Sequence, residues 1–254
     1  MPKSSTDKRH FIIIAALIAI VTVLTDQLLV MALPLPTAAS TQAATIDGVI
    51  RLHLALIAFF FALVMVFMLY SFVVFRRRQG DDGDGEHFHG NYVLEIAWTV
   101  VPLVIVLVLG YVGVRALTSV TRAQSNELVV AAEGFQWAWQ FTYEDSVISP
   151  DLVLPVDQPV LMELNARDVL HSFWVPEFRV KQDLVPGQTT TVRFTPSEVG
   201  EYQLVCAELC GLSHWSMVAT VRVVEQAEYD QWLSEQIAAI TPAVADSQAG
   251  AEAK

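Results

Sequence analysis

Residues 206–217 read CAELCGLSHWSM, and this stretch places four soft metal ligands within one short segment. The ligands are two thiols, an imidazole and a thioether, contributed by Cys206, Cys210, His214 and Met217. Such ligands together select copper over hard cations such as Mg²⁺. A blue site with one copper ion needs a single cysteine, so the second cysteine indicates two copper ions that share both sulfur atoms.

A single loop approaches a pair of ions from one side, so a second imidazole is expected from a distant part of the chain. His171, within the sequence DVLHSF at 168–173, is the only other histidine after residue 117. Met217 is then expected as a weak axial ligand of one ion. The backbone carbonyl of Glu208, between the two cysteines, is expected to serve the other ion.

Two other interpretations of the motif remain open at this point. Cys206 and Cys210 would form a disulfide if both met an oxidant in an extracytoplasmic compartment. A zinc site would also accept the cysteines and the histidines, although it has no use for Met217. The complete set of ligands favours copper.

Short runs rich in Val, Thr, Phe, Tyr and Trp occupy the chain after residue 126, and turn residues separate them. Six such runs at this spacing predict an all-β sandwich or barrel. The runs are Glu127–Ala132, Phe135–Tyr143, Val160–Asn165, Thr189–Phe194, Gly200–Val205 and Met217–Val224. In the second run, Trp137 and Trp139 are two residues apart, so a strand would turn both toward the same side.

Two long apolar runs, Val49–Phe75 and Tyr92–Val114, precede the β-rich part. Each exceeds the roughly 20 residues that a helix needs to cross the hydrocarbon core. They predict a transmembrane helical hairpin at residues 46–117. The triplet Arg76-Arg77-Arg78 marks the connecting loop as cytoplasmic, which places the C-terminal half outside the membrane. The hydrophobic fraction of 54% agrees with a membrane protein.

Residues 1–45 allow two interpretations. Lys3, Lys8 and Arg9 precede an apolar stretch that begins at Phe11, and small residues follow near position 40. This order is typical of a cleaved secretory signal peptide. The apolar stretch to Leu33 is also just long enough for an additional membrane helix.

The net charge of −12 is confined to the C-terminal half. Residues 1–117 contain eight Lys/Arg and eight Asp/Glu, whereas residues 118–254 contain seven Lys/Arg and nineteen Asp/Glu. An acidic domain repels nucleic acid and attracts basic partners. We expect the β-rich domain at 118–228, and a C-terminal helix with a disordered tail at 229–254.

The motif resembles the copper-site signature of subunit II of haem–copper cytochrome c oxidases, Cys-x-Glu-x-Cys-x-x-x-His-x-x-Met. Further similar segments are EIAWTVVP at 95–102, GFQWAW at 134–139, residues 168–176 and VPG at 185–187. The resemblance implies a cupredoxin-like Greek-key β-barrel with a dinuclear copper (CuA) centre. This domain would take electrons from cytochrome c and pass them to haem in subunit I for oxygen reduction coupled to proton pumping. Subunit III is a further expected partner, and the location is the plasma membrane of a bacterial-type cell.

The same resemblance implies roles for residues outside the copper ligands. Trp137 matches the point at which electrons enter from cytochrome c, although Ala138 replaces a tyrosine found in many relatives. The side chain of Glu208 matches a ligand of a magnesium or manganese ion shared with subunit I. Glu95 matches the mouth of a proton-uptake path into subunit I, and Asp168 matches an acidic residue of the donor-docking face.

Two alternative functions have features that would distinguish them. An electron-transfer domain of the nitrous-oxide-reductase type shares the dicopper loop but lacks the hairpin and the motif around Glu95. A non-redox subunit of the quinol-oxidase type would lack the copper ligands, all of which are present. No Cys-x-x-Cys-His motif for a fused haem c occurs, so the electron donor is expected to be a separate protein.

Overall fold

Residues 5–77, 79–80, 83 and 89–252 are described by the computed structural model. The chain divides into a helical unit, residues 1–35 and 47–115, and a β unit, residues 36–46 and 116–254. Lys3, Arg78 and most of the loop between the second and third helices lie outside the described residues.

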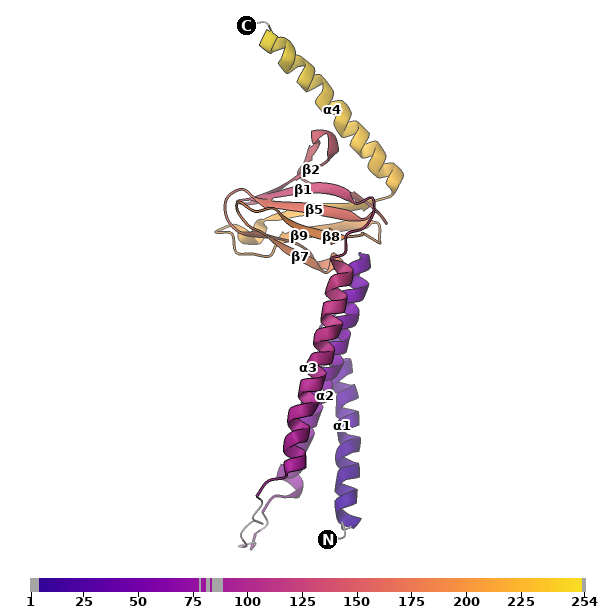
Figure 1. Ribbon diagram of the computed structural model, residues 1–254, viewed down its shortest axis with the longest axis vertical. Helices are drawn as coiled ribbons and strands as arrows, with labels where there is room; N and C mark the ends of the chain where they lie inside the picture. The colour runs from indigo at the N-terminus through magenta and orange to yellow at the C-terminus, as the bar shows by residue number, and fades with distance from the viewer. Residues whose placement is uncertain (1–4, 78, 81–82, 84–88, 253–254) are drawn as a thin grey trace. The chain divides into compact units, whose positions relative to one another are not determined.

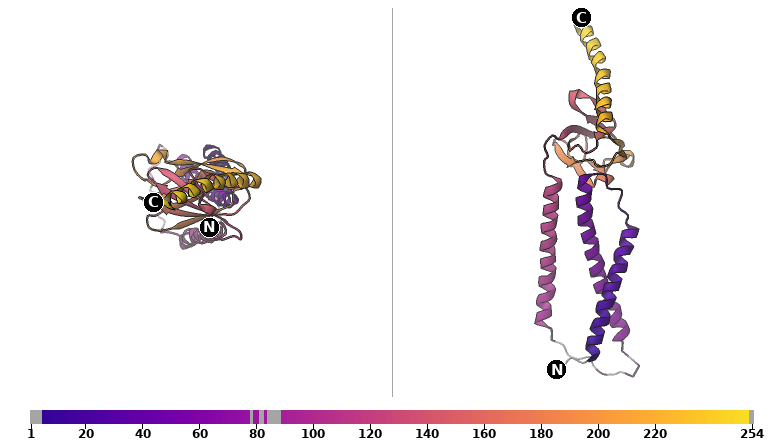
Figure 2. Two further views of the ribbon diagram at one scale, coloured as in Figure 1. Left: turned by 90° about the horizontal axis from the view of Figure 1, so that it is seen from above. Right: turned by 90° about the vertical axis from the view of Figure 1, so that its right-hand side faces the viewer.

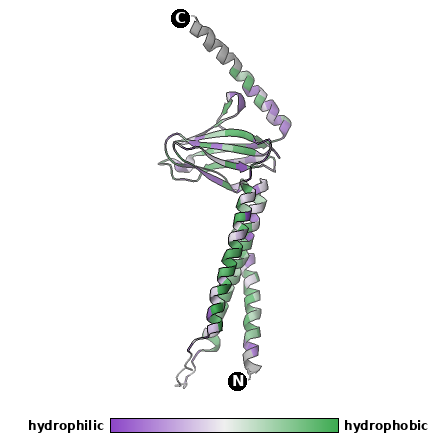
Figure 3. Cartoon of the chain, viewed as in Figure 1, coloured by the Kyte–Doolittle hydropathy of each residue, from purple (hydrophilic) through white to green (hydrophobic). Residues whose placement is uncertain are grey.

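The helical unit contains α1 (Ser5–Ala32) and most of α2 (Thr41–Val74) and α3 (Tyr92–Val120). All three are long and apolar enough to cross a membrane, and most of their length is coloured as hydrophobic in Figure 3. A helix that is apolar on all sides is typical of a membrane span. The predicted hairpin is present, and α2 begins eight residues before the expected Val49 because the polar segment from Thr41 continues the same helix.

Helix α1 packs beside α2 (Figure 2). His10 Nδ1 and the hydroxyl of Tyr70 are hydrogen-bonded at 2.6 Å. Ala58 and Ala62 of α2 are fully buried, because small side chains allow a neighbouring helix to approach closely. α1 thus has the length and the packing of an additional membrane helix, while its cleavage as a signal peptide stays untested.

Helix α3 begins at a capping residue and carries Glu95 in its first turn. The side chain of Asn91 accepts hydrogen bonds from the backbone N–H groups of Val93 and Leu94, at 3.1 and 3.2 Å. These bonds satisfy donors that a helix N-terminus leaves free. Glu95 is exposed in this first turn, at the end of α3 that the positive-inside rule assigns to the cytoplasm.

The β unit is a sandwich of two five-stranded sheets, drawn as stacked layers in Figure 1. One sheet has the order β3-β2-β1-β5-β8 and the other β4-β10-β9-β6-β7. The strands are β1 (Leu128–Phe135), β2 (Ala138–Thr142), β3 (Ile148–Ser149), β4 (Leu152–Pro155), β5 (Val160–Ala166), β6 (His171–Val175), β7 (Val180–Leu184), β8 (Thr190–Phe194), β9 (Gly200–Cys206) and β10 (Val218–Val224).

Most neighbouring strands are antiparallel, but β1 pairs with β5 and β4 pairs with β10 in parallel. The chain therefore crosses between the sheets instead of following simple hairpins, as the expected cupredoxin-like Greek-key fold requires. Between the sheets lies an apolar core that includes the fully buried Phe141, Phe173, Phe194 and Leu204. The predicted fold class, a membrane hairpin plus an all-β cupredoxin-like domain, is confirmed.

The segment 36–46 is part of the β unit, although it precedes α2 and part of it begins that helix. The N–H of Ala39 donates to the carbonyl of Glu177 at 2.9 Å, and the N–H of Thr41 donates to Thr195 at 3.0 Å. Ala39 and Ser40 are buried by this contact. The small residues near position 40 thus have a packing role, and the β unit includes residues before the expected boundary at 118.

Two local expectations differ from the structure. The run Phe135–Tyr143 is not one strand, because β1 ends at Phe135 and β2 starts at Ala138 after a turn. Trp137 lies in this turn and is 37% exposed, whereas Trp139 on β2 is 4% exposed, so the two indoles do not face the same side. Helix α4 (Gln226–Glu252) is the expected C-terminal helix and includes an alanine-rich stretch, since alanine has the highest helix propensity, while the disorder of the tail stays a prediction.

Candidate metal centre

The second sheet brings His171 and Cys206 together. His171 is the first residue of β6, Cys206 is the last residue of β9, and these strands are antiparallel neighbours with Phe173 opposite Cys206. The N–H of Ala207 donates to the carbonyl of Ser172 at 3.0 Å. The N–H of Cys206 donates to the carbonyl of Met217 at 3.0 Å, which closes the loop 207–217 at its base. Backbone pairing thus positions both ends of the motif.

The side chains of the motif converge at one point. The Sγ atoms of Cys206 and Cys210 are 3.8 Å apart, and both cysteines are free. Nδ1 of His171 lies 3.9 Å from the Cys206 sulfur, and Nδ1 of His214 lies 3.5 Å from the Cys210 sulfur. The thioether sulfur of Met217 is 3.7 Å from Cys210, and the carbonyl oxygen of Glu208 is 3.2 Å from the Cys206 sulfur.

This arrangement fits a soft metal ion. The ligand atoms of His171, Cys206 and Cys210 lie within 4.8 Å of one another, and all three residues are buried. Met217 is fully buried as well. A buried cluster of two thiols and an imidazole with no disulfide is the donor set that copper or zinc selects, and the thioether favours copper. The structure thus places every predicted copper ligand at one site.

Burial raises the pKa of the Cys210 thiol to about 11, and the adjacent Cys206 contributes to the same shift. The metal-free thiol is therefore protonated at neutral pH, although the thiolate is the form that binds a metal. Binding must then release a proton from Cys210.

Copper uptake by the metal-free protein is expected to depend steeply on pH. Because the folded pKa of Cys210 is raised, protons compete with copper at any pH below about 11. For each proton released, we expect the apparent affinity to rise by about tenfold per pH unit. Titrations against a chelating competitor between pH 6 and 8 measure this slope. An affinity independent of pH would show that Cys210 is not a ligand.

Asp168 holds the ring of His171 in place. The Nε2–H of His171 donates to Oδ1 of Asp168 at 2.8 Å, so Nδ1 is the nitrogen that faces the sulfur atoms. Oδ2 of Asp168 accepts the N–H of Gln136 at 2.8 Å, and Oδ1 accepts the N–H of Val169 at 2.7 Å. Burial opposes ionisation of this carboxyl, but the bonds from His171, Gln136 and Val169 outweigh it and lower the pKa of Asp168. A carboxylate that orients a ligating histidine is typical of metal sites.

The substitution Asp168→Asn is expected to weaken copper binding by about 10- to 100-fold, the usual cost of removing such an outer partner. The amide keeps the size of the carboxylate but removes the negative charge that holds the Nε2–H tautomer of His171. The measurement is the copper dissociation constant at a fixed pH, with Asp151→Asn as a control on the same domain. Equal affinities for Asp168→Asn and the unaltered protein would contradict the orienting role.

Trp137 lies against the loop that carries the cysteines. A Cβ atom added to Gly211 would lie 3.3 Å from Cζ2 of Trp137 and 2.9 Å from Nε2 of Gln136. Gly211 also has a φ of +118°, which side-chain-bearing residues rarely adopt. Nε2 of Gln136 donates to the carbonyl of Cys210 at 2.7 Å. The partly exposed indole of Trp137 thus limits the space beside Gly211, the residue that follows the predicted ligand Cys210.

Two other predicted residues lie elsewhere or differ in burial. Glu208 is half-buried, and its backbone oxygen lies 3.2 Å from the Cys206 sulfur. Glu95 belongs to the helical unit and lies at the start of α3. Neither placement tests the role that the resemblance implies.

Two contacts of the site were not predicted from the sequence. The interpretation of Asp168 as a docking residue misses its bond to His171, and Gln136 is missed altogether. The spacing Asp168-x-x-His171 carries a signal for the first contact, because an acid near a ligating histidine is a frequent partner. No signal in the sequence points to the contact between Gln136 and Cys210, since these residues are distant in the chain.

Together, the fold and the site define a membrane-anchored protein with an extracytoplasmic cupredoxin-like domain that carries a copper-type ligand cluster. Family comparisons refine this class. The family model "Cytochrome C oxidase subunit II, periplasmic domain" matches residues 147–224. The model "Cytochrome C oxidase subunit II, transmembrane domain" matches residues 26–115. The chain belongs to the cytochrome c oxidase subunit II family.

Two relatives agree with this assignment. Cytochrome c oxidase subunit 2 of Synechocystis sp. is 32% identical over 263 residues, which cover 85% of this chain and 78% of the relative. Cytochrome c oxidase subunit 2 of Thermostichus vulcanus is 34% identical over 267 residues, which cover 84% of this chain and 81% of that relative. The solved periplasmic domain of subunit II of cytochrome oxidase (CoxB) of Bradyrhizobium japonicum is 28% identical, with a TM-score of 0.43 over 45% of this chain and 96% of that chain.

The chain is therefore a subunit of a respiratory haem–copper oxidase, set in the membrane with its C-terminal domain outside. Its donor cluster supports copper binding. The comparisons support the expected function and neither of the alternatives, the nitrous-oxide-reductase type and the non-redox quinol-oxidase type.

Proposed function

We propose that the β unit holds a dinuclear copper centre through which the oxidase receives its electrons. Cys206 and Cys210 would bridge the two ions, and His171 and His214 would each bind one. Met217 and the carbonyl of Glu208 would complete the two coordination spheres. The observation that supports this proposal is the distance of 3.8 Å between two free, buried thiols that each face a different imidazole nitrogen.

Bound copper would supply one-electron redox chemistry, shared between two ions through the common thiolates. The contribution of the chain is to hold the ligands nearly fixed. Asp168 fixes the ring and the tautomer of His171, and the backbone bond between Cys206 and Met217 fixes the base of the loop. The burial of Cys206, Cys210 and Met217 keeps water away from the sulfur atoms, which tunes the potential of such a site.

Electrons would enter through Trp137 and leave toward haem in subunit I, where oxygen is reduced and protons are pumped. Two observations support this route. The indole of Trp137 is partly exposed, so a donor can reach it. Its ring also lies against Gly211, directly beside Cys210. The family resemblance assigns oxygen reduction to subunit I, and this sequence has no Cys-x-x-Cys-His motif for haem c.

The expected donor is cytochrome c or a similar basic protein, because residues 118–254 carry nineteen acidic and seven basic residues. Opposite charges steer the encounter of two proteins. We expect the second-order rate of electron transfer from reduced cytochrome c to fall as ionic strength rises, since the screening length is about 10 Å at 0.1 M salt. Stopped-flow mixing over a series of salt concentrations measures this dependence. A rate that does not change with salt would contradict acidic docking.

Two further roles follow from the family resemblance. The carboxylate of Glu208 would bind a magnesium or manganese ion shared with subunit I, and its half-buried position leaves it accessible to a partner. Glu95, exposed in the first turn of α3, would stand at the mouth of a proton-uptake path. An ionisable group in a membrane helix is a functional candidate by default. Subunit III is a further proposed partner.

The order of reduction tests this function. When the assembled oxidase is mixed with reduced cytochrome c, the optical signal of oxidised copper should bleach before any haem becomes reduced. Haem reduction that precedes the copper signal, or that proceeds equally fast in a preparation without copper in this domain, would contradict the proposed route.

A further inference from the structure

The buried side chains of β1 become smaller toward the end of the strand. Val130, Ala132 and Gly134 are its three buried residues, and the size of the side chain falls in that order. Because residues two apart in a strand point to the same side, all three positions face the core between the sheets. A glycine inside a strand weakens it, and often marks a place where another group approaches the backbone closely. Gly134 therefore indicates that the space it leaves is used.

The imidazole of His171 occupies this space. A Cβ atom added to Gly134 would lie 3.3 Å from both Cγ and Cδ2 of His171, and 3.1 Å from Cδ2 of Leu184. His171 and Leu184 are cross-strand partners on β6 and β7, whereas Gly134 belongs to the opposite sheet. Gly134 does not have a positive φ, so the backbone conformation does not require glycine here. The close approach of the His171 ring does.

Trp139 borders the same space. It is the cross-strand partner of Gly134 on β2, so both positions face the same side of their sheet. The indole and the imidazole of His171 form a T-shaped pair, with ring centroids 6.4 Å apart and an angle of 61° between the planes. The ring of His171 thus packs among Gly134, Leu184 and Trp139, in addition to its bond from Nε2 to Asp168.

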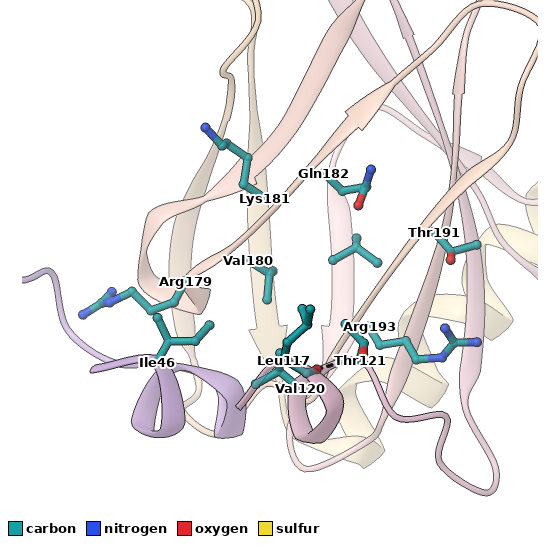
Figure 4. Close-up of a pocket in the computed structure, with 11 residues that line it drawn as sticks. Ile46, Leu117, Val120, Thr121, Arg179, Val180, Lys181, Gln182, Thr191 and Arg193 are labelled. Atoms are coloured by element: carbon teal, nitrogen blue, oxygen red, sulfur yellow. Dashed lines mark hydrogen bonds between the residues drawn. The ribbon is translucent and has the colours of Figure 1, made fainter. Parts of the chain in front are cut away.

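The β unit is not packed this closely everywhere. Figure 4 shows a pocket of about 340 Å³ near the start of β7, where Val180 lies. The cationic side chains of this pocket point apart, and Arg193 is paired with Glu127 at 3.0 Å. Leu184 lies at the other end of β7, beside the ring of His171. The domain thus leaves open space at one end of this strand, whereas a ligand ring is tightly held at the other.

We propose that Gly134 is a positioning residue of the copper centre, because the missing side chain sets the place of the His171 imidazole. This inference rests on the proposed dinuclear centre. A metal site keeps its ligand distances within about 0.2 Å. A Cβ atom at position 134 would force its neighbours to move by a few tenths of an ångström. The displacement is therefore at least as large as the tolerance of the metal–nitrogen bond.

The displacement falls on His171 because its ring is held at two points. Nε2 is bonded to Asp168 at 2.8 Å, and Nδ1 faces the Cys206 sulfur at 3.9 Å. A push against Cγ and Cδ2 must change one of these two contacts. Leu184 has a flexible side chain, but it is fully buried and a close-packed core leaves it little room to withdraw.

The test uses the full-length chain, purified in detergent and freed of metal. Copper affinity is measured by titration against a chelating competitor, and the electron paramagnetic resonance spectrum of the copper-loaded chain is recorded. For Gly134→Ala we expect an affinity about tenfold lower, similar to the loss of an outer partner of a ligand. We also expect an altered copper spectrum, since the bond to His171 changes.

Gly200→Ala is the matched control. Its added Cβ would lie 3.1 Å from the hydroxyl oxygen of Tyr202, a contact as tight as those at Gly134. Gly200 begins β9, however, whereas the ligand Cys206 ends it, so the change lies far from the copper site. We expect the copper affinity and the spectrum of the unaltered chain. Equal losses in Gly134→Ala and Gly200→Ala would overturn the proposal.

A double variant separates the effect on His171 from the effect on Leu184. Leu184→Val removes the Cδ2 atom that lies 3.1 Å from the added Cβ, so Gly134→Ala with Leu184→Val retains only the tight contact with His171. Relative to Leu184→Val alone, we expect the double variant to show the same loss of affinity and the same altered spectrum. Recovery of both would overturn the proposal, because Gly134 would then act through the packing of Leu184. The double variant also serves if Gly134→Ala alone does not fold.

The melting temperature of the metal-free chain is measured for every variant, because overpacking a core is destabilising by itself. A lower melting temperature with unchanged copper affinity and spectrum would overturn the role of Gly134 and leave the proposed function intact. An unaltered chain that binds no copper, or shows the spectrum of a single copper ion, would overturn both.

Discussion

A Cys210→Ser oxidase is expected to lose copper from the β unit and to oxidise cytochrome c at least about 100-fold more slowly, since even an outer-sphere change costs about 10- to 100-fold. The side chain of Cys210 lies close to three other predicted ligands. Its sulfur lies 3.8 Å from that of Cys206, 3.5 Å from Nδ1 of His214 and 3.7 Å from the thioether of Met217. Serine keeps the shape but offers a hard oxygen that copper binds poorly.

The matched control for this substitution is Ser216→Ala on the same loop. The hydroxyl of Ser216 donates to the carbonyl of Ser213 at 2.9 Å and is exposed, so its loss changes the loop without removing a ligand. Copper content and turnover should stay within about twofold for this variant, as is usual for a surface position. A Cys210→Ser complex that assembles, keeps two copper ions and turns over normally would contradict the bridging role.

The second large effect is expected for Trp137→Ala. Electron transfer from reduced cytochrome c should slow by at least about tenfold, which corresponds to roughly 1.4 kcal/mol in the barrier. The indole fills the space between solvent and Gly211, beside Cys210, and alanine leaves that space to water. Reduction of the copper centre by a small chemical reductant should be unchanged, because such a molecule does not need the indole.

Trp174→Ala is the matched control, because Trp174 has nearly the same exposure, 39% compared with 37% for Trp137, but lies outside the copper loop. We expect a normal rate for this variant. An equal loss in both variants, or an equal loss with the small reductant, would show that Trp137 acts through the stability of the domain and not as the point of electron input.

The proposed copper ligands are predictable from the sequence because most of them are local. Cys206, Cys210, His214 and Met217 occupy one loop, so their chemistry is visible without a fold. His171 is distant in the chain and is found only because it is the one histidine after residue 117 besides His214. The strand that carries it, β6, is missed, since its five residues are too few to show a clear alternation.

The six runs predicted as strands all contain strands, whereas β3, β4, β6 and β7 are missed. β3 has two residues and β4 ends at Pro155, while β7 is an edge strand of mixed polarity. The wrong prediction that Trp137 and Trp139 face the same side of one strand has a related cause. Alternation of faces holds within one strand, and the sequence does not reveal the turn at residues 136–137. Gln136 reaches Asp168 and Cys210 only through this turn.

Metal analysis with electron paramagnetic resonance of the purified oxidase tests the central claim most directly. We predict about two copper ions in the β unit per chain and a spectrum in which one unpaired electron is delocalised over both ions. The Cys206→Ser and Cys210→Ser variants should each lose this spectrum. One copper ion with an ordinary blue-site spectrum, or zinc in place of copper, would contradict the account.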